Sequence, residues 1–361
     1  MTHAERLARI RLIRTPHVGP VSWHQLMQRF GSGEAALEAL PDLALRGGAG
    51  KPRIASVDIA ERELARVAEL GARHVFSDEA DYSPLLREVE GAPPAIIVRG
   101  DTAMLQRPCV AIVGARNASA IANRFARQMA TDLAARGVTV VSGLARGVDT
   151  SAHLGALGGS TAAVIASGID IAFPPENAEL QEKIASDQLL VAEQPPGTDP
   201  LARHFPTRNR IIAGLAHGTL VIEAAPRSGS LITARRAGDY GREVMAVPGS
   251  PLDPRAQGCN QLIREGATLI QTVDDVLEAL GPIDARMARE PRRAYVETLA
   301  VPDMGDGDRD VVAGLLGPTP VAVDEIVRQS GRSAAAVQLV LLELELAGRV
   351  ARHAGARVSL M

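Results

Sequence analysis

FPTRNRIIAGLAHGTLVIEAAPRSGSLITARRA, residues 205–237, decides the fold of this 361-residue chain. Its central run GTLVIEA (218–224) is short, apolar and β-branched, which predicts a buried strand. Five arginines surround that strand and share a single acid, Glu223, although the whole chain has a formal net charge of -3. A local excess of guanidinium groups on a slightly acidic chain indicates an anion site. The five arginines are Arg208, Arg210, Arg227, Arg235 and Arg236.

The polar residues beside this strand indicate that the anion is a phosphate. Arg208-Asn209-Arg210 precedes the strand, and Ser228-Gly229-Ser230 follows it, with Thr233 a few residues further on. Ligands of parallel sheets bind at the carboxyl ends of the strands, and guanidinium groups suit phosphate oxygens. The alternative is a solvated helix face rich in arginine, but such a face would favour alanine and glutamate where this sequence has glycine and serine.

The sequence on both sides of this stretch alternates between similar strands and helix-compatible segments. Short apolar strands separated by helices predict an α/β fold with a doubly wound, mostly parallel sheet. The other predicted strands are CVAIVG (109–114), VTVVSG (138–143), TAAVIAS (161–167), QLLVAE (188–193) and EVMAVPG (243–249).

Changes in composition divide the chain into four segments. The sheet is predicted for residues 72–281, after a small helical domain at 1–71 and before a linker at 282–308 that is rich in charge, Pro and Gly. Residues 309–361 give three helices and a β-hairpin, the order of a winged helix.

The two small domains give no strong sign of DNA contact. The turn TPHVGP (15–20) half-matches a helix-hairpin-helix, but Val21 stands where that motif needs a second glycine. In the winged helix, the presumed recognition helix carries Glu343 and Glu345, whereas groove binding needs positive charge. We therefore expect helical packing from the first domain and protein contact from the second.

Composition excludes several classes of protein. A hydrophobic fraction of 46% indicates a globular protein. There is no apolar run of transmembrane length and no signal peptide at the N-terminus, so we expect a cytoplasmic protein without membrane contact. Cys109 and Cys259 stand alone, without zinc-ligand spacing, so neither a structural disulfide nor a metal site is expected.

The turn after the strand at 109–114 resembles a dinucleotide-binding loop but departs from it. Arg116 stands where GxGxxG has its second glycine, and Ser119 stands at the third, after Gly114 at the first. A side chain at the second position obstructs a pyrophosphate, and the next strand ends in Ser142 rather than a ribose-binding acid, so no NAD or other cofactor is expected. A helix N-terminus with an arginine and a serine suits a single phosphate, although an ordinary strand-to-helix turn is an equal alternative.

A second turn of this kind follows the next strand. Ser142, Gly143, Ala145 and Arg146 are predicted to line a neighbouring phosphate pocket. Asp149, a little further on, could support the loop as a helix-capping acid. His153 is expected to be a packed helix residue and not a catalytic one.

No catalytic motif is present, so we expect a binding protein and not an enzyme. The string GGAGKP (47–52) fails as a Walker motif because Leu45 replaces its first glycine and Pro52 follows the lysine. The sequence also lacks a GxSxG elbow, an HExxH pair and a cysteine beside a suitable base.

Taken together, these blocks resemble the DprA/Smf family of DNA-processing proteins over nearly the whole chain. The markers are AIVGAR, SGLARGVDTSAH, ASGIDIAFPPEN, FPTRNRIIAGL, VIEAAPRSGSLITA, and REVMAVPGS followed by GCNQLIREGA. One departure is Ile121-Ala122, where many members have Tyr-Gly. The resemblance implies a Rossmann-like domain that binds single-stranded DNA, forms a homodimer and loads the RecA recombinase during natural transformation.

The resemblance also assigns residues. It implies that Gly114, Arg116 and Ser119 face one phosphate and that residues 142–146 line the next pocket, while Arg208-Asn209-Arg210 forms a basic groove. Phe205, which precedes that groove between His204 and Pro206 in a loop-like setting, is a candidate for stacking on a base, with a buried core role as the alternative.

A second class of function stays open. Nucleoside-monophosphate phosphoribohydrolases have a similar fold, with a glycine-rich phosphate turn, an acid and an arginine in the active site. Glu223, followed by Ser228-Gly229-Ser230 and Thr233, could serve in that way. We favour an ion pair between Glu223 and Arg208 or Arg210, because an isolated charge beside an apolar strand needs a partner.

Overall fold

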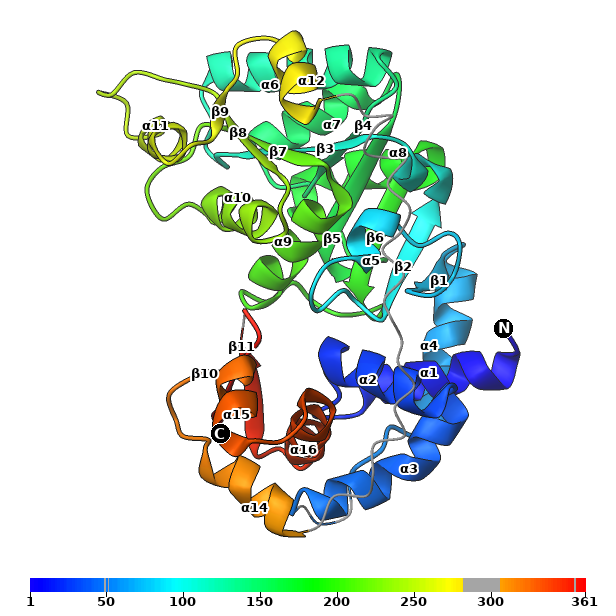
Figure 1. The fold of residues 1–361 in the computed structure, drawn as a ribbon. Coiled ribbons are helices and arrows are strands. Elements are labelled where there is room, and N and C mark those ends of the chain that lie inside the picture. The colour runs from blue at the N-terminus through cyan, green and yellow to red at the C-terminus, as the bar shows by residue number, and fades with distance from the viewer. Residues whose placement is uncertain (49, 51, 282–305, 354) are drawn as a thin grey trace. The chain divides into compact units, whose positions relative to one another are not determined.

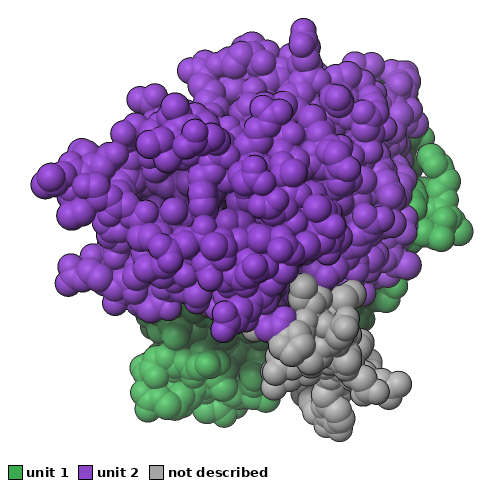
Figure 2. Space-filling model, turned by 90° about the horizontal axis from the view of Figure 1, so that it is seen from above, with its two compact units in different colours: residues 1–62, 291–361 green, residues 63–290 purple. Residues whose placement is uncertain are grey.

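A computed structural model describes residues 1–48, 50, 52–281, 306–353 and 355–361 of the chain. These residues form two compact units, which Figure 2 colours separately. One unit is residues 63–290, and the other combines residues 1–62 with residues 291–361. The predicted linker, residues 282–308, lies almost entirely outside the described residues.

The unit of residues 63–290 is built on a nine-stranded sheet with the order β1-β2-β6-β5-β4-β3-β7-β8-β9 (Figure 1). All pairs from β6 to β9 are parallel, and β1 and β2 add an antiparallel edge. The strands are β1 (Arg73–Phe76), β2 (Ala95–Gly100), β3 (Cys109–Gly114), β4 (Thr139–Ser142), β5 (Thr161–Gly168), β6 (Leu189–Gln194), β7 (Gly218–Ile222), β8 (Glu243–Ala246) and β9 (Thr268–Leu269). The predicted doubly wound, mostly parallel sheet is confirmed.

Helices cover both faces of this sheet, because successive side chains of each central strand point to opposite sides. The helices α6, α7 and α12 lie on one face of the sheet, and α9 and α10 lie on the other (Figure 1). In β3, Val110 and Ile112 pack against α6, α7 and α12, whereas Ala111 and Val113 pack in the core formed with α9, α10 and α11. The helices are α4 (Val57–Glu69), α5 (Pro84–Arg87), α6 (Ala120–Ala135), α7 (Val148–Ala156), α8 (Ala178–Asp187), α9 (His204–Leu215), α10 (Gly229–Asp239), α11 (Gln257–Arg264) and α12 (Val273–Leu280), with short 3₁₀ turns η1 (Thr102–Gln106) and η2 (Pro175–Asn177).

The second unit joins the two ends of the chain. Its described elements are α1 (His3–Arg14), α2 (Pro20–Phe30), α3 (Gly33–Arg46), α14 (Asp306–Gly314), α15 (Val323–Ser330) and α16 (Ala334–Leu346), with a three-stranded sheet of β10 (Val321–Ala322), β12 (Arg357–Leu360) and β11 (Val350–His353). The predicted order of three helices and a hairpin is confirmed, with β10 added at the edge of the hairpin.

The N-terminal helices pack directly against α16. Gln25 of α2 donates to Gln338 of α16 at 2.8 Å, and the Arg349 guanidinium donates to the Gly47 carbonyl at 3.2 Å. Gly47 is in such close contact with α16 that a Cβ atom there would lie 2.0 Å from the Glu343 carbonyl oxygen. The terminal segments therefore share one packed core.

Burial, and not acidic charge, is the reason to expect that α16 does not bind in a DNA groove. Glu343 is fully buried, where its carboxylate accepts a 2.8 Å hydrogen bond from Arg309, and Glu345 pairs with Arg352. The two acids therefore do not form an exposed acidic face. Instead, α16 is apolar and buried on most of its circumference, so it is a core helix of this unit.

Candidate nucleic-acid interface

A pocket of about 450 Å³ lies at the carboxyl ends of β3 and β7. The chain leaves β3 through α6 toward β4, and it leaves β7 through α10 toward β8, on the other side in the sheet order. The two connections therefore diverge, which makes this a topological switch point. Open parallel sheets bind their ligands at such points.

Nine of the predicted site residues line the pocket, and six do not. Those that line it are Gly114, Arg116, Ala145, Arg208, Asn209, Ser228, Gly229, Ser230 and Thr233. The sequence also pointed to Ser119, Ser142, Gly143, Arg146, Phe205 and Arg210, which are not among the lining residues. The structure adds Val113, Ala115, Asn117, Asp149, Ile212, Ala225 and Arg255 to the lining.

Two glycines let the loops approach each other at the pocket. A Cβ atom on Gly114 would lie 1.9 Å from the Ile222 carbonyl oxygen of the neighbouring strand. Gly147 has a φ of 75°, and a Cβ atom there would lie 2.4 Å from the Ala115 carbonyl oxygen. Both positions require glycine, so Gly114, the one glycine of the dinucleotide-like turn, serves local packing here.

Arg208 forms the buried floor of the pocket. Its Nη1 atom donates to the carbonyls of Gly143, at 2.5 Å, and Val164, at 2.7 Å, which ties the end of β4 to β5. Burial lowers the pKa of this guanidinium to about 10, and the nearby Asp149 carboxylate opposes that shift. Its Nε atom is buried and has no hydrogen-bond partner among the described residues.

Asp149 supports the loop after β4, as the sequence suggested. Its carboxylate accepts hydrogen bonds from the backbone N–H groups of Gly143, at 3.2 Å, and Ala145, at 3.4 Å. Burial raises the pKa of Asp149 to about 6, against the lowering effect of Arg208. One turn further along α7, His153 is fully buried against Thr161, and burial lowers its pKa to about 3, so its expected role as a packed residue is confirmed.

The predicted groove of Arg208, Asn209 and Arg210 is wrong. Arg210 points away from the pocket, donating to the Gly91 carbonyl at 2.7 Å and forming an ion pair with Glu193. These residues lie on α9, where positions two apart face roughly opposite sides of the helix. Only Arg208 and Asn209 can therefore share one site.

Three further residues of the predicted second pocket have other partners. The Ser142 hydroxyl is buried and donates to the Ile112 carbonyl at 2.6 Å. Gly143 provides space for Arg208, because a Cβ atom there would lie 1.9 Å from the guanidinium. Arg146 is exposed and forms an ion pair with Glu176. The turn after β4 therefore braces the pocket, and only Ala145 reaches its lining.

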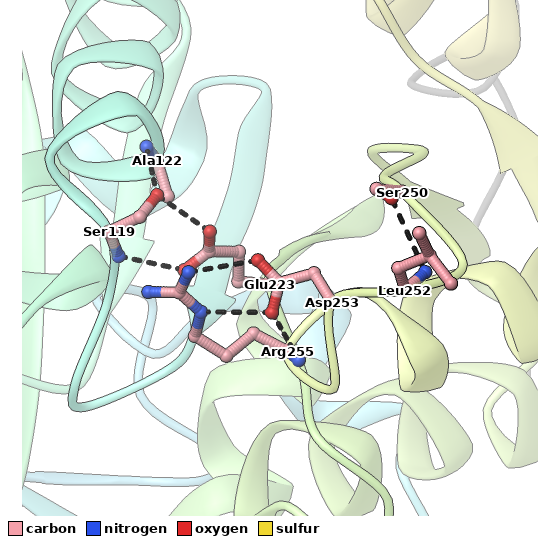
Figure 3. Close-up of polar contacts among 7 residues, drawn as sticks. All are labelled: Ser119, Ala122, Glu223, Ser250, Leu252, Asp253 and Arg255. Carbon is pink, nitrogen blue, oxygen red and sulfur yellow. Dashed lines mark hydrogen bonds and ion pairs between the residues drawn. The ribbon is translucent and has the colours of Figure 1, made fainter.

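Glu223 occupies the N-terminus of α6 (Figure 3). Its carboxylate accepts hydrogen bonds from the Ser119 backbone N–H at 2.9 Å and from the Ser119 hydroxyl at 2.6 Å. The predicted ion pair with Arg208 or Arg210 is therefore wrong. Because the carboxylate already uses these donors, Ser119 does not offer them to a phosphate in this structure, contrary to expectation.

Arg255 is a pocket cation that sequence reasoning missed. It follows β8, and its guanidinium donates to both Asp253 carboxylate oxygens, at 3.1 and 2.8 Å, beside Glu223 (Figure 3). The hydrogen bonds to Asp253 and the charge of Glu223 raise the pKa of Arg255 above its ordinary value. The signal that could have found Arg255 is its place after a predicted strand of the same sheet.

The N-terminus of α10 supplies polar groups to the other wall. Ser228 is the N-cap residue, accepting from the Ser230 N–H at 3.3 Å, and its hydroxyl lies 2.7 Å from that of Ser230. Asn209 donates to the Gly229 carbonyl at 3.2 Å, which joins α9 to this turn. Two hydroxyls at the positive end of a helix favour an anion.

Arg116 is the exposed cation of the pocket. It forms no hydrogen bond or ion pair with any residue that the structure describes, and its guanidinium carbon lies 5.3 Å from the centroid of the Phe205 ring. Phe205 is half-buried in the first turn of α9, so its predicted loop setting is wrong. Pro206 fits there because the first helical N–H groups have no partner within the helix.

Other kinds of site find no support in the described parts of the chain. They contain no cluster of His, Cys, Asp and Glu that could hold a metal ion. Cys109 and Cys259 are both free and buried. No helix among the described residues combines the length and the apolar character needed to cross a bilayer.

A switch-point pocket lined by arginines and by the N-terminus of a helix, at the carboxyl ends of parallel strands, defines a Rossmann-like domain. The chain belongs to the DprA/Smf family of DNA-processing proteins. The family model for DNA recombination-mediator protein A matches residues 73–281. A DprA-like N-terminal HHH domain matches residues 3–65, and a DprA winged helix domain matches residues 297–356.

Individual relatives agree with this assignment. Protein Smf of Synechocystis sp. is 33% identical over 378 residues, covering 94% of this chain and 95% of its own. The X-ray structure of DNA processing protein A from Streptococcus pneumoniae has a TM-score of 0.65 at 34% identity and covers 77% of this chain and 98% of its own. A Helicobacter pylori DprA structure, described as giving insight into a unique single-stranded DNA binding mode, has a TM-score of 0.53 at 27% identity, covering 58% and 95%.

Proposed function

We propose that this protein binds single-stranded DNA, with a backbone phosphate in the pocket between β3 and β7. The observation that carries the proposal is Arg116, an exposed cation without a carboxylate partner among the described residues, which lines the pocket and lies against the Phe205 ring. A cation beside an aromatic ring can hold a phosphate while a base stacks nearby. This combination suits a single strand, because the bases of a duplex are already stacked on each other.

The remaining pocket groups support a phosphate ligand. Ser228 and Ser230 at the N-terminus of α10 can donate to phosphate oxygens, and Arg255 adds a second guanidinium at the rim. The buried positive charge of Arg208 at the floor of the pocket would attract the phosphate, while its hydrogen bonds to the Gly143 and Val164 carbonyls hold the end of β4 against β5. The relative from Helicobacter pylori, whose structure is described in terms of single-stranded DNA binding, supports the same ligand here.

We propose that the protein binds DNA without catalysing a reaction on it. The competing function, a phosphoribohydrolase for nucleoside monophosphates, needs an acid directed at the ligand. Glu223 instead accepts two hydrogen bonds from Ser119 and does not line the pocket. Incubation with nucleoside monophosphates tests this point, because release of free base would favour the hydrolase.

The family suggests the biological setting. We propose that the protein acts in the cytoplasm as a homodimer, protects incoming DNA and loads RecA onto it during natural transformation. RecA loading is tested by following RecA filament assembly on DNA covered by single-strand-binding protein. Assembly should speed up when this protein is added, and an unchanged rate would remove the loading role.

The binding itself is tested by the fluorescence anisotropy of a labelled oligonucleotide titrated with the full chain. Saturable binding of strands of unrelated sequence with similar affinity is expected, because phosphates and ring faces are common to all strands. Absence of binding at low salt would contradict the proposal.

A further inference from the structure

Phe173 is an exposed aromatic residue beside the pocket. Its relative exposure is 44%, and no other aromatic side chain in the described parts of the chain belongs to the exposed large hydrophobic residues. The chain has only five phenylalanines, three tyrosines and one tryptophan. One exposed apolar side chain is ordinary on a protein surface, so the neighbours of Phe173 decide whether it has a role.

The Phe173 ring belongs to a cluster with Phe205 and Arg116. The centroids of the two rings lie 5.7 Å apart, with an angle of 58° between their planes. The Arg116 guanidinium carbon lies 5.3 Å from the Phe205 centroid. The cluster therefore connects the phosphate pocket, through Arg116, to an exposed aromatic ring.

The spacing of the rings determines where a base could stack. A base inserted between two rings needs about 3.5 Å on each side, or roughly 7 Å in total, and the two phenylalanines are closer than that. Phe205 is half-buried and already has Arg116 against its ring. The accessible aromatic surface is therefore that of Phe173.

Phe173 is held in place by a pinned loop. The Ser167 hydroxyl donates to the Ile171 carbonyl at 2.8 Å, and the Gly168 N–H donates to the Thr198 carbonyl at 2.9 Å. On the other side, the Asn177 amide donates to the Leu144 carbonyl at 2.8 Å, which attaches the segment to the turn after β4. A ring held in this way loses little conformational freedom when it binds a ligand.

We propose that Phe173 provides the stacking surface for the nucleobase next to the phosphate that Arg116 holds. This inference rests on the proposed single-stranded DNA binding and identifies a base-contacting residue that sequence reasoning did not single out. Stacking on a ring face tolerates any base and releases no counterions. Phe173 therefore contributes to affinity without contributing to sequence preference or to salt dependence.

The test compares a normal oligonucleotide with one of equal length and charge in which abasic sites replace the bases. Anisotropy titrations use the parent, Phe173→Ala and Phe173→Tyr. Leu154→Ala is the matched control, because Leu154 is an apolar residue of α7 with a similar exposure of 38% and lies outside the pocket lining. Thermal unfolding of each variant reports whether the fold is intact.

Phe173→Ala should weaken binding of the normal strand by roughly 5- to 150-fold and leave binding of the abasic strand almost unchanged. Phe173→Tyr and Leu154→Ala should bind as the parent does, and the salt slope should stay the same in all four proteins. An equal loss on both strands, or no loss on either, would overturn the role of Phe173. Failure of the parent to bind the normal strand would instead overturn the proposed function.

Discussion

Replacement of Arg116 by alanine separates a role in DNA binding from a role in the fold. The side chain is exposed and makes no hydrogen bond or ion pair within the described residues. The substitution does remove the cation–π interaction between Arg116 and the Phe205 ring, and such an interaction at an exposed site is worth about 0.5–1 kcal/mol. The free energy of unfolding should therefore fall by about 1 kcal/mol at most.

The expected loss of DNA affinity is larger than this loss of stability. A hydrogen bond to a charged group contributes about 1.5–3 kcal/mol, so Arg116→Ala should weaken single-strand binding by roughly 10- to 150-fold. Removing one interaction with a phosphate should also reduce the slope of log affinity against log salt concentration by about 0.7. The two effects together distinguish a phosphate contact from a stacking contact.

Arg136→Ala is the matched control for Arg116→Ala. It removes the same charge at the C-cap of α6, a helix about 24 Å long that begins shortly after Arg116, and Arg136 pairs there with Asp274 at the surface. Anisotropy titrations over a salt series, with chemical unfolding of the same samples, give both quantities. Equal affinities and equal salt slopes for Arg116→Ala and the parent would refute the phosphate contact.

Three further predictions concern the fold and its terminal unit. Gly47→Ala should destabilise the terminal unit by about 1–3 kcal/mol and expose residues 1–62 to protease, because its Cβ atom would lie 2.0 Å from the Glu343 carbonyl oxygen. Gly50→Ala is the control and should have neither effect, because Gly50 has open space around it. Equal protease resistance of the two variants would contradict the packing of Gly47 against α16. Deletion of residues 309–361 should leave most single-strand affinity in place, since the pocket lies within residues 63–290, and loss of most binding would reassign the DNA site. Two buried groups make the free energy of unfolding depend on pH between about pH 4 and pH 6. His153 is neutral in the folded protein and protonated in the unfolded chain, so it makes stability rise with pH. Asp149, with its raised pKa of about 6, holds a proton in the folded protein that the unfolded chain has lost, so it makes stability fall with pH. Asp149→Asn leaves only the first effect. Urea unfolding at about pH 4.5 and about pH 5.5 should therefore show the stability of the variant rising relative to the parent by about 1 kcal/mol over that interval, and parallel pH profiles would refute the assignment.

The central strands were predictable because each is a compact β-branched run followed by a turn. CVAIVG at 109–114 coincides with β3, and the other predicted strands coincide with β4 to β8 within a few residues. The strands β1, β2 and β9 were not identified. β1 and β9 have four and two residues, which give too little periodicity to read. β2 was missed although its six residues, AIIVRG, have the same apolar character as the strands that were predicted. The start of α9 at His204 was also missed, because Phe205-Pro206 has the composition of a loop.

The candidate site was less predictable than the fold because its chemistry depends on long-range partners. The sequence placed Arg208 and Arg210 together, but their partners, Gly143 and Val164 for one and Gly91 and Glu193 for the other, come from distant segments. In the same way, nothing local shows that the Glu223 carboxylate caps α6. Arg116 was predictable, because it stands directly after a strand in a turn that would otherwise hold glycine.

The central claim is that the pocket and its aromatic neighbours recognise single-stranded DNA. The most direct measurement is a comparison of the affinities of the full chain for single-stranded and double-stranded oligonucleotides of one sequence over a salt series. We predict tighter binding of the single strand at every salt concentration. The affinity should fall as salt rises, because arginines that contact phosphates displace cations condensed on the DNA. Equal affinity for the duplex, or binding that does not depend on salt, would contradict the claim.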